Sequence, residues 1–165
     1  MTKIAEETSD ILDEDPDLHA RVQNMLDHCE IVNVRVIDFS GSRTDVDGRP
    51  TTASITSETS YFVSAEAMAN RYVWDATLSN ETTESVAELK ATILVDYKLS
   101  EGFSPDKEAA DAIAKTTGFF AAYPYVRELL QSTTTRLQLD PLVLGFLMKG
   151  EQAPRSLHQT TIHHR

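Results

Sequence analysis

The feature that most constrains the fold is a regular alternation of apolar and polar residues between Val86 and Leu99. Apolar or aromatic residues occupy every odd position from Ala87 onward, and most even positions between them carry charged or hydroxyl side chains. Successive side chains of a β-strand point to opposite faces of the sheet, so the pattern predicts a strand with one buried face and one solvated face. Strands of this kind are typical of antiparallel sheets.

Three further strands are predicted over residues 31–39, 54–64 and 68–79, where β-branched and aromatic residues concentrate. The third of these also alternates and places Tyr72 and Trp74 on one face. A polar loop over 41–52 and a short connector over 80–85 separate the strands. The sequence therefore predicts a four-stranded antiparallel sheet in the first two thirds of the chain.

Helices are predicted on both sides of this sheet. Asp15 and Pro16 form a start signal for a helix that continues to Cys29. After the sheet, residues 104–106 begin a short alanine-rich helix that ends near Gly118, and a second helix follows to about Leu137. The last helix carries an apolar stripe with a spacing that puts its members on one helical face. The members of this stripe are Phe119, Tyr123, Val126, Leu130 and Leu137.

The order of these elements predicts the class α+β, with helices segregated from the strands. We expect a single domain over 15–149, a disordered acidic lead over 1–14 and a flexible tail over 150–165. The 165 residues carry a formal net charge of −11, which disfavours nucleic acid because phosphate contacts need lysine and arginine. The N-terminus lacks the apolar core of a signal peptide, and no apolar run is long enough for membrane insertion, so a cytoplasmic protein is expected.

Signals of catalysis are poor. The single cysteine, Cys29, excludes an internal disulfide and multi-cysteine metal motifs. His158, His163 and His164 lie near the end of the chain without supporting carboxylates or thiols. The sequence contains no glycine-rich phosphate loop and no nucleophile elbow. We therefore predict no catalytic residue, no metal site and no cofactor.

Two proline-containing segments carry a family resemblance. The run Tyr123-Pro-Tyr-x-Arg-Glu128 and the downstream Asp140-Pro-Leu-x-Leu144 resemble the signature of the SecB family of export chaperones. The resemblance covers roughly residues 30–147 and is strongest between Gly118 and Leu144. It implies a four-stranded sheet followed by helices, subunits that assemble as a dimer of dimers, and binding of unfolded or nascent polypeptide without ATP.

The chain departs from the family pattern at both ends. The family commonly has a further helix at the C-terminus, whereas the segment 141–149 is short and is followed by polar residues. Conversely, the predicted helix before the first strand is longer than the lead of many members. These features look more like the actinobacterial branch, some members of which serve toxin–antitoxin modules.

The resemblance also implies site residues. Polypeptide clients need exposed apolar walls, because apolar contacts are non-directional and accept many sequences. For Tyr72, Trp74 and Tyr123, however, ordinary core packing is favoured over client contact. The predicted client-binding residues are Tyr61, Phe62, Trp74, Phe103, Phe119, Phe120, Leu142, Leu144, Phe146 and Leu147. The predicted oligomer-interface residues are Tyr123, Tyr125, Val126, Arg127, Glu128 and Leu130.

Acidic residues on the outer face of the family's sheet contact the basic tail of the SecA motor. Strand matching puts Asp38 and Asp96 at two such positions, whereas a third is Ser42 in this chain, which weakens the case for motor binding. Taken singly, each of the two acids is better explained as an ordinary surface carboxylate. The main prediction is therefore an ATP-independent, homotetrameric holdase with SecA or an antitoxin as a partner. The competing prediction is a small α+β ligand-binding domain or enzyme with an aromatic-lined pocket. A third class is a dedicated partner of one protein, such as an antitoxin.

Overall fold

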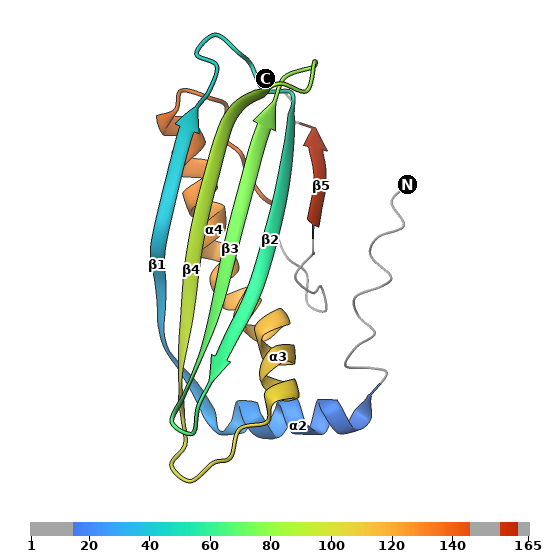
Figure 1. The fold of residues 1–165 in the computed structure, drawn as a ribbon, viewed down its shortest axis with the longest axis vertical. Coiled ribbons are helices and arrows are strands. Elements are labelled where there is room, and N and C mark those ends of the chain that lie inside the picture. The colour runs from blue at the N-terminus through green and yellow to red at the C-terminus, as the bar shows by residue number, and fades with distance from the viewer. Residues whose placement is uncertain (1–14, 146–155, 162–165) are drawn as a thin grey trace.

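The computed structural model describes residues 15–145 and 156–161, and it places helices on one face and at one end of a twisted antiparallel sheet (Figure 1). The predicted acidic lead over 1–14 lies outside the described residues. The helices are α2 (Pro16–Asp27), α3 (Lys107–Lys115) and α4 (Thr117–Arg136). The strands are β1 (Cys29–Arg43), β2 (Thr52–Val63), β3 (Ala67–Ser79), β4 (Ser85–Leu99) and β5 (Ser156–Thr161).

The sheet has the strand order β1-β4-β3-β2-β5, and each neighbouring pair is antiparallel. The first four strands confirm the predicted sheet. The fifth was not predicted, because residues 150–165 were expected to form a flexible tail. Instead, Ser156–Thr161 pairs with the first part of β2, at the edge away from β3 (Figure 1). This part of the tail prediction is corrected.

Burial in the two central strands follows the predicted alternation. Every odd residue of β4 from Ala87 to Leu99 is buried, while Glu88, Lys90 and Lys98 on the opposite face are exposed. In β3, Tyr72 and Trp74 are fully buried. Both strands therefore turn one face toward α3 and α4, and this inner face holds most of the hydrophobic core.

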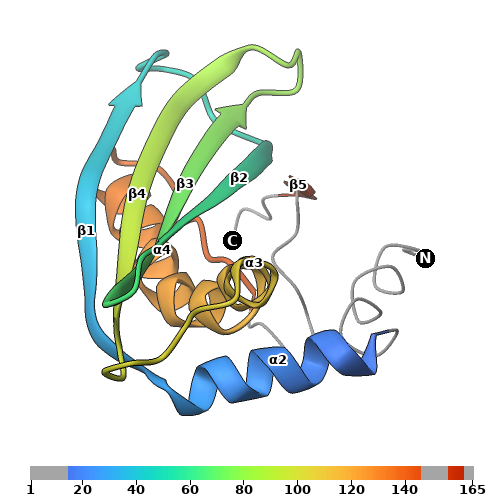
Figure 2. The same ribbon diagram turned by 60° about the horizontal axis from the view of Figure 1, so that its bottom comes forward.

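Helix α2 begins where the sequence predicted. The Asp15 carboxylate accepts hydrogen bonds from the backbone amides of Asp17 (3.0 Å) and Leu18 (3.1 Å), and Pro16 occupies the first turn. The helix ends at Asp27, two residues before the predicted end, because the chain enters β1 at Cys29. Figure 2 shows α2 running across one end of the sheet, next to α3. The residues that α2 buries are Leu18, Val22 and Met25.

An arginine joins α2 to the start of α3. The Arg21 guanidinium donates to the Asp106 carboxylate at 3.1 Å and 3.2 Å and to Glu108 at 2.9 Å. Asp106 is also the N-cap of α3, because its carboxylate accepts from the Ala109 amide at 2.7 Å. One ionic cluster thus fixes both the start of α3 and the position of α2.

Helix α4 buries most of the predicted stripe, since Phe119, Tyr123, Val126 and Leu130 are all at most 7% exposed. It starts at Thr117, so Pro124 lies inside the helix and not near its start as predicted. Proline has no amide hydrogen, so the carbonyl of the residue four positions earlier loses its helical partner there. None of the helices formed by the described residues is both long enough and apolar enough to cross a bilayer.

Close backbone contacts position α4 on the sheet. A Cβ atom at Gly118 would lie 2.4 Å from both Asn70 Nδ2 and the Tyr72 hydroxyl, so only glycine allows this approach to β3. Near the other end of α4, a Cβ atom at Gly41 of β1 would lie 2.4 Å from Thr133 Cγ2. The helix is therefore held close to the sheet at both of its ends.

Candidate functional site

An aromatic cluster fills the space between the sheet and α4. The Trp74 and Phe119 rings stack with centroids 5.2 Å apart, and Tyr123 lies 6.0 Å from Trp74 and 5.8 Å from Phe119. Trp74 and Phe119 are 0% exposed. The prediction that these two residues contact clients is therefore corrected, because solvent and ligand cannot reach their rings. The same packing removes the basis for an aromatic-lined pocket on this face, on which the competing enzyme hypothesis rested.

The segment that follows α4 folds back onto the helix. The Tyr123 hydroxyl donates to the Gly145 carbonyl oxygen at 2.8 Å, and the Leu142 amide donates to the Thr134 hydroxyl at 2.9 Å. Leu142 and Leu144 are 4% and 5% exposed and belong to the core. Their predicted client contact is corrected for the same reason. The structure shows no helix over 141–145, and the rest of the segment in which the family's terminal helix was expected to be short or missing lies outside the described residues.

Two of the predicted client residues do reach the surface. Phe62 is 63% exposed and Tyr61 is 37% exposed, and both lie near the end of β2. Phe103 and Phe120 are half-buried, and the Phe103 ring stacks on the His28 ring at 4.6 Å. Phe146 and Leu147 lie outside the described residues.

The predicted interface residues of α4 fall into two groups, one buried within the chain and one at its surface. Tyr123, Val126 and Leu130 are buried within the chain, so they stabilise the subunit and cannot form its outer surface. The residues that face outward are Tyr125, which is 43% exposed, and Glu128, while Arg127 is half-buried. Of the predicted interface residues, Tyr125 and Glu128 are therefore the ones that a second subunit could reach most easily.

Strand β1 carries an exposed apolar surface that the sequence prediction missed. Five large apolar residues within nine positions of this edge strand are 38% to 55% exposed, whereas Val34 among them packs against the core. Exposed apolar groups that gather in one place usually mark a binding surface. The signal in the sequence was the run of β-branched residues without alternation. The exposed residues are Ile31, Val32, Val36, Ile37 and Phe39.

The two acids proposed for the motor contact lie on the outer face of the sheet, as predicted. Asp38 pairs in register with Thr92, and Asp96 pairs with Asn33. Asp96, however, forms an ion pair with Arg35 at 2.8 Å, which offsets its charge. Asp38 is the more accessible of the two carboxylates for a basic partner.

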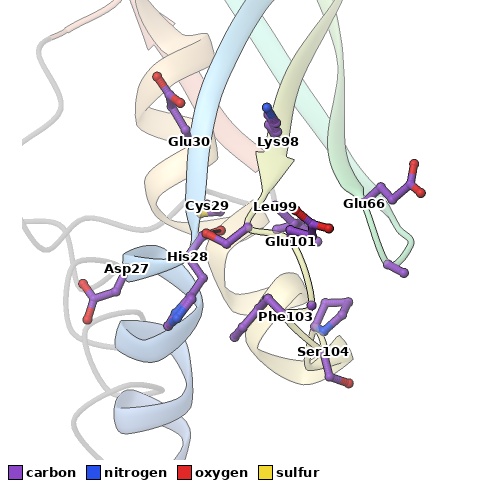
Figure 3. A pocket seen from close by; sticks show the side chains of 14 residues that line it. Asp27, His28, Cys29, Glu30, Glu66, Lys98, Leu99, Glu101, Phe103 and Ser104 are labelled. Atoms are coloured by element: carbon purple, nitrogen blue, oxygen red, sulfur yellow. Dashed lines mark hydrogen bonds between the residues drawn. The ribbon is translucent and has the colours of Figure 1, made fainter.

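A large open pocket lies where α2, β1 and the loop between β4 and α3 meet (Figure 3). Its volume is about 1160 Å³, and Asp27, Glu30, Glu66 and Glu101 contribute to its rim. Figure 3 shows these carboxylates pointing in different directions and the Phe103 ring beside His28. Among the described residues, no group of histidine, cysteine and acidic side chains is arranged to hold a metal ion.

Cys29 also lines this pocket, at the start of β1. It is half-buried, and burial raises the pKa of the Cys29 thiol above its ordinary value. A raised pKa keeps the sulfur protonated at neutral pH and makes it a poor nucleophile. The pocket therefore combines acidic side chains with a thiol that burial keeps protonated at neutral pH.

An antiparallel sheet with a preceding helix at one end and with α3 and α4 on one face is the fold of a SecB-like chaperone, and the resemblance predicted from the sequence is confirmed. The Mycobacterium tuberculosis Rv1957 SecB-like chaperone, whose structure was solved in complex with a ChAD peptide from the Rv1956 HigA1 antitoxin, aligns with a TM-score of 0.71. The two chains are 25% identical, and the alignment covers 78% of this chain and 98% of that chain.

Two curated proteins of Mycobacterium tuberculosis are similar to part of this chain. The SecB-like chaperone MT2006 of strain CDC 1551 / Oshkosh is 40% identical over 83 residues, which cover 49% of this chain and 46% of that protein. The SecB-like chaperone Rv1957 of strain ATCC 25618 / H37Rv is 44% identical over 66 residues, covering 39% and 36%. Each match thus spans less than half the length of the curated relative. No protein-family model matches the chain.

Proposed function

We propose that this chain is a cytoplasmic, ATP-independent chaperone that holds non-native polypeptides through exposed apolar surface. The observation that carries the proposal is the concentration of exposed large apolar side chains on β1 and at the end of β2, in a fold shared with a SecB-like chaperone. Such surfaces bind many sequences because apolar burial does not require a fixed geometry. They hold a client as long as it exposes apolar segments of its own.

The test is suppression of aggregation. A chemically unfolded client is diluted into buffer with increasing amounts of the protein, and light scattering is recorded with and without ATP. We expect the same suppression in both conditions, because the sequence has no phosphate-binding loop. Replacing Phe62 by Ser should weaken suppression, whereas Val46→Ser, which changes an exposed residue of the loop between β1 and β2, should not. A requirement for ATP contradicts the proposal.

For the client we propose an antitoxin as well as newly made proteins. This proposal follows from the relative Rv1957, which was solved with a peptide from the HigA1 antitoxin. An antitoxin client predicts that one protein co-purifies from the native host in excess over all others. A broad mixture of nascent chains would instead indicate a general role in protein export.

We also propose that four copies assemble as a dimer of dimers. The exposed residues Tyr125 and Glu128 of α4 and the apolar strand β1 support this proposal, because a lone subunit leaves both in water. The expected mass is four times the 18.4 kDa of one chain. Analytical ultracentrifugation at micromolar concentration tests it, and a monomer under those conditions would contradict it.

A contact with the SecA motor is the last part of the proposal. Asp38 supports it as an exposed carboxylate on the outer face of the sheet, and the formal charge of −11 favours basic partners in general. Asp96, the second predicted acid, supports the motor contact less, because its carboxylate is already paired with Arg35.

A further inference from the structure

Helices α3 and α4 follow each other along the chain with a single residue between them. Lys115 ends α3, Thr117 begins α4, and Thr116 is the cap of both helices. The helical hydrogen bonds stop after the Thr116 amide donates to the Ala112 carbonyl oxygen (3.1 Å), and they resume where the Phe120 amide donates to Thr116 (3.1 Å). Figure 2 shows α3 nearly along its axis and α4 from the side, so the two helices are not collinear.

The local sequence does not require this break. Residues 107–123 contain no proline, a single glycine and several alanines, and alanine is the strongest helix former. The Thr116 hydroxyl donates back to the Ala112 carbonyl oxygen at 2.7 Å and forms no capping hydrogen bond to α4. Helix α3 has only nine residues, which is below the length at which an isolated helix is stable. The backbone alone therefore favours one continuous helix over two separate ones, because each helix must be nucleated.

A tyrosine of the sheet contacts the chain at this break. In a continuous helix, the Ala114 carbonyl oxygen would accept a hydrogen bond from the amide of Gly118, four residues further on. In the structure it accepts from the Tyr72 hydroxyl of β3 at 2.6 Å, in a buried position. A buried carbonyl group needs a hydrogen-bond partner, and Tyr72 supplies one from outside the helix. The last turn of α3 is therefore fixed to the sheet.

The first turn of α4 touches the sheet at the same place. A Cβ atom at Gly118 would lie 2.4 Å from the Tyr72 hydroxyl and from Asn70 Nδ2, and 2.7 Å from the Tyr97 hydroxyl. These three residues are buried, and Asn70 Nδ2 donates to the Tyr97 hydroxyl at 3.2 Å. Of the three, Tyr72 is the one that donates to α3. The sheet thus fixes both sides of the break through one cluster of polar groups.

The opposite end of α3 is held by the ionic cluster that joins it to α2. The Arg21 guanidinium donates to Asp106, the N-cap of α3, and to Glu108 in its first turn. The Arg21 side chain is 31% exposed, so salt weakens this contact. Between its two ends, α3 packs against β2, α2 and α4. Helix α3 is therefore held by a solvent-accessible ionic contact at its start and by a buried hydroxyl at its end.

We propose that residues 107–136 are a two-state element, which the sheet keeps as two helices and which becomes one continuous helix when the Tyr72 contact is lost. Straightening withdraws α3 from β2 and separates Arg21 from Asp106 and Glu108. It therefore uncovers part of the inner face of the sheet. Discrete arrangements of this kind are the elements through which conformational switches operate. This change of shape belongs to the subunit itself and does not depend on the proposed function.

The experiment measures one distance across the break in the full chain. Lys107 and Gln131 are exposed, so Lys107→Cys and Gln131→Cys can carry spin labels in a Cys29→Ser background. Labelled chains are mixed with a large excess of unlabelled chains, so that any assembly contains at most one labelled copy. A continuous helix would place the two positions about 36 Å apart, at 1.5 Å per residue, whereas the bent pair gives a shorter distance. Pulsed electron paramagnetic resonance resolves the two populations.

Tyr72→Phe keeps the aromatic ring and removes the hydroxyl group that donates to Ala114. We expect the population near 36 Å to rise at least about tenfold over that of the wild type, because a buried acceptor without a partner disfavours the bent form. Tyr97→Phe removes the neighbouring buried hydroxyl and is the matched control, which should leave the distance unchanged. An equal rise in both variants overturns the role of Tyr72.

Gly118→Ala provides a second test that retains the Tyr72 hydroxyl. Alanine favours the helix more than glycine does, and its Cβ atom prevents the close approach to the sheet, so we expect the same lengthening. Fluorescence of the buried Trp74 shows whether each variant keeps its fold. If the distance stays short in Tyr72→Phe, in Gly118→Ala and in the double variant, the local sequence sets the break and the proposed two-state element is wrong.

Discussion

The hydroxyl group of Tyr123 donates a 2.8 Å hydrogen bond to the carbonyl oxygen of Gly145, and so ties the middle of α4 to the segment that folds back over it. The two residues are 22 positions apart in the sequence. Because Leu142 and Leu144 lie on the same segment and are buried, this bond helps to hold their side chains in the core.

Removing this hydroxyl should loosen the segment without unfolding the protein. We expect Tyr123→Phe to lower the free energy of unfolding by about 1 kcal/mol, because the Gly145 carbonyl loses its partner. Urea denaturation followed by tryptophan fluorescence measures the change. Tyr125→Phe on the exposed face of the same helix is the matched control and should change stability by less than about 0.5 kcal/mol. Equal effects of both variants would contradict the assigned role.

Adding a methyl group at Gly118 should be costly. Its Cβ atom would lie 2.4 Å from the Tyr72 hydroxyl and 2.7 Å from the Tyr97 hydroxyl. We expect Gly118→Ala to destabilise the protein by about 1–3 kcal/mol, because a packed core resists added volume. Gly145→Ala, where a Cβ atom meets no neighbour within 4 Å, is the control and should be nearly neutral. A neutral Gly118→Ala would show that α4 can move away from the sheet.

The cluster at the start of α3 should make stability depend on acid pH. The Ala109 amide, followed by the Arg21 guanidinium, holds the pKa of the Asp106 carboxyl below its usual range. A lowered pKa in the folded state stabilises the fold above the unfolded value, and this contribution is lost as the pH falls through the folded value. Asp106→Asn keeps a capping side chain but cannot ionise.

We therefore expect Asp106→Asn to melt at a lower temperature than the wild type at pH 7 and at nearly the same temperature at about pH 2 to 3. Thermal melts followed by circular dichroism across this range make the comparison. Asp47→Asn, in the loop before β2, provides a control for loss of one charge elsewhere. A difference between Asp106→Asn and the wild type that persists unchanged in acid would mean that the charge of Asp106 is not the cause.

Assembly should respond differently to two residues of α4. Tyr125→Asp adds a charge to an exposed position, so we expect a folded subunit that does not form the proposed tetramer, because a charge buried in an interface lacks a partner. Leu130 is 2% exposed within the chain, so Leu130→Asp should unfold the subunit itself. Circular dichroism and light scattering on both variants separate the two effects. A full tetramer for Tyr125→Asp would move the interface away from α4.

Reversing the charge at Asp38 should weaken the binding of a basic motor tail and leave the binding of clients unchanged. We expect Asp38→Lys to reduce binding of such a tail at low salt, with the difference shrinking as salt rises, because exposed charges are screened beyond about 8–10 Å. Asp47→Lys makes the same charge change on a loop and should have a smaller effect. Titration of the tail at two salt concentrations, beside an aggregation assay, measures both activities. Loss of client holding in Asp38→Lys would show that this face is structural.

Strands and helices could be predicted well from the sequence where burial of one face makes apolar residues recur at a regular spacing. Alternation in β4 and the stripe on α4 reflect two surfaces that pack against each other, so both could be found without a structure. Strand β5 could not be found this way, because an edge strand held by backbone hydrogen bonds needs no apolar pattern.

Residue type alone was a poor guide to the site. Trp74 and Phe62 are both large aromatic residues, yet one is 0% exposed and the other is 63% exposed. The difference comes from the strand register and from the path of α4, neither of which is encoded in a local pattern. Leu142 and Leu144 were misassigned because a short segment without helical signals was expected to lie open, whereas two hydrogen bonds to α4 fold it back.

The ionic cluster that joins α2 to α3 has a consequence for synthesis of the chain. Arg21 and Asp106 are 85 positions apart, so α2 leaves the ribosome well before its partner has been made. At usual elongation speeds this interval is roughly 4–17 s. During that time the apolar stripe of α2 has no α3 to cover it. A newly made copy is therefore for several seconds an incompletely folded protein whose first helix exposes its apolar side chains to water.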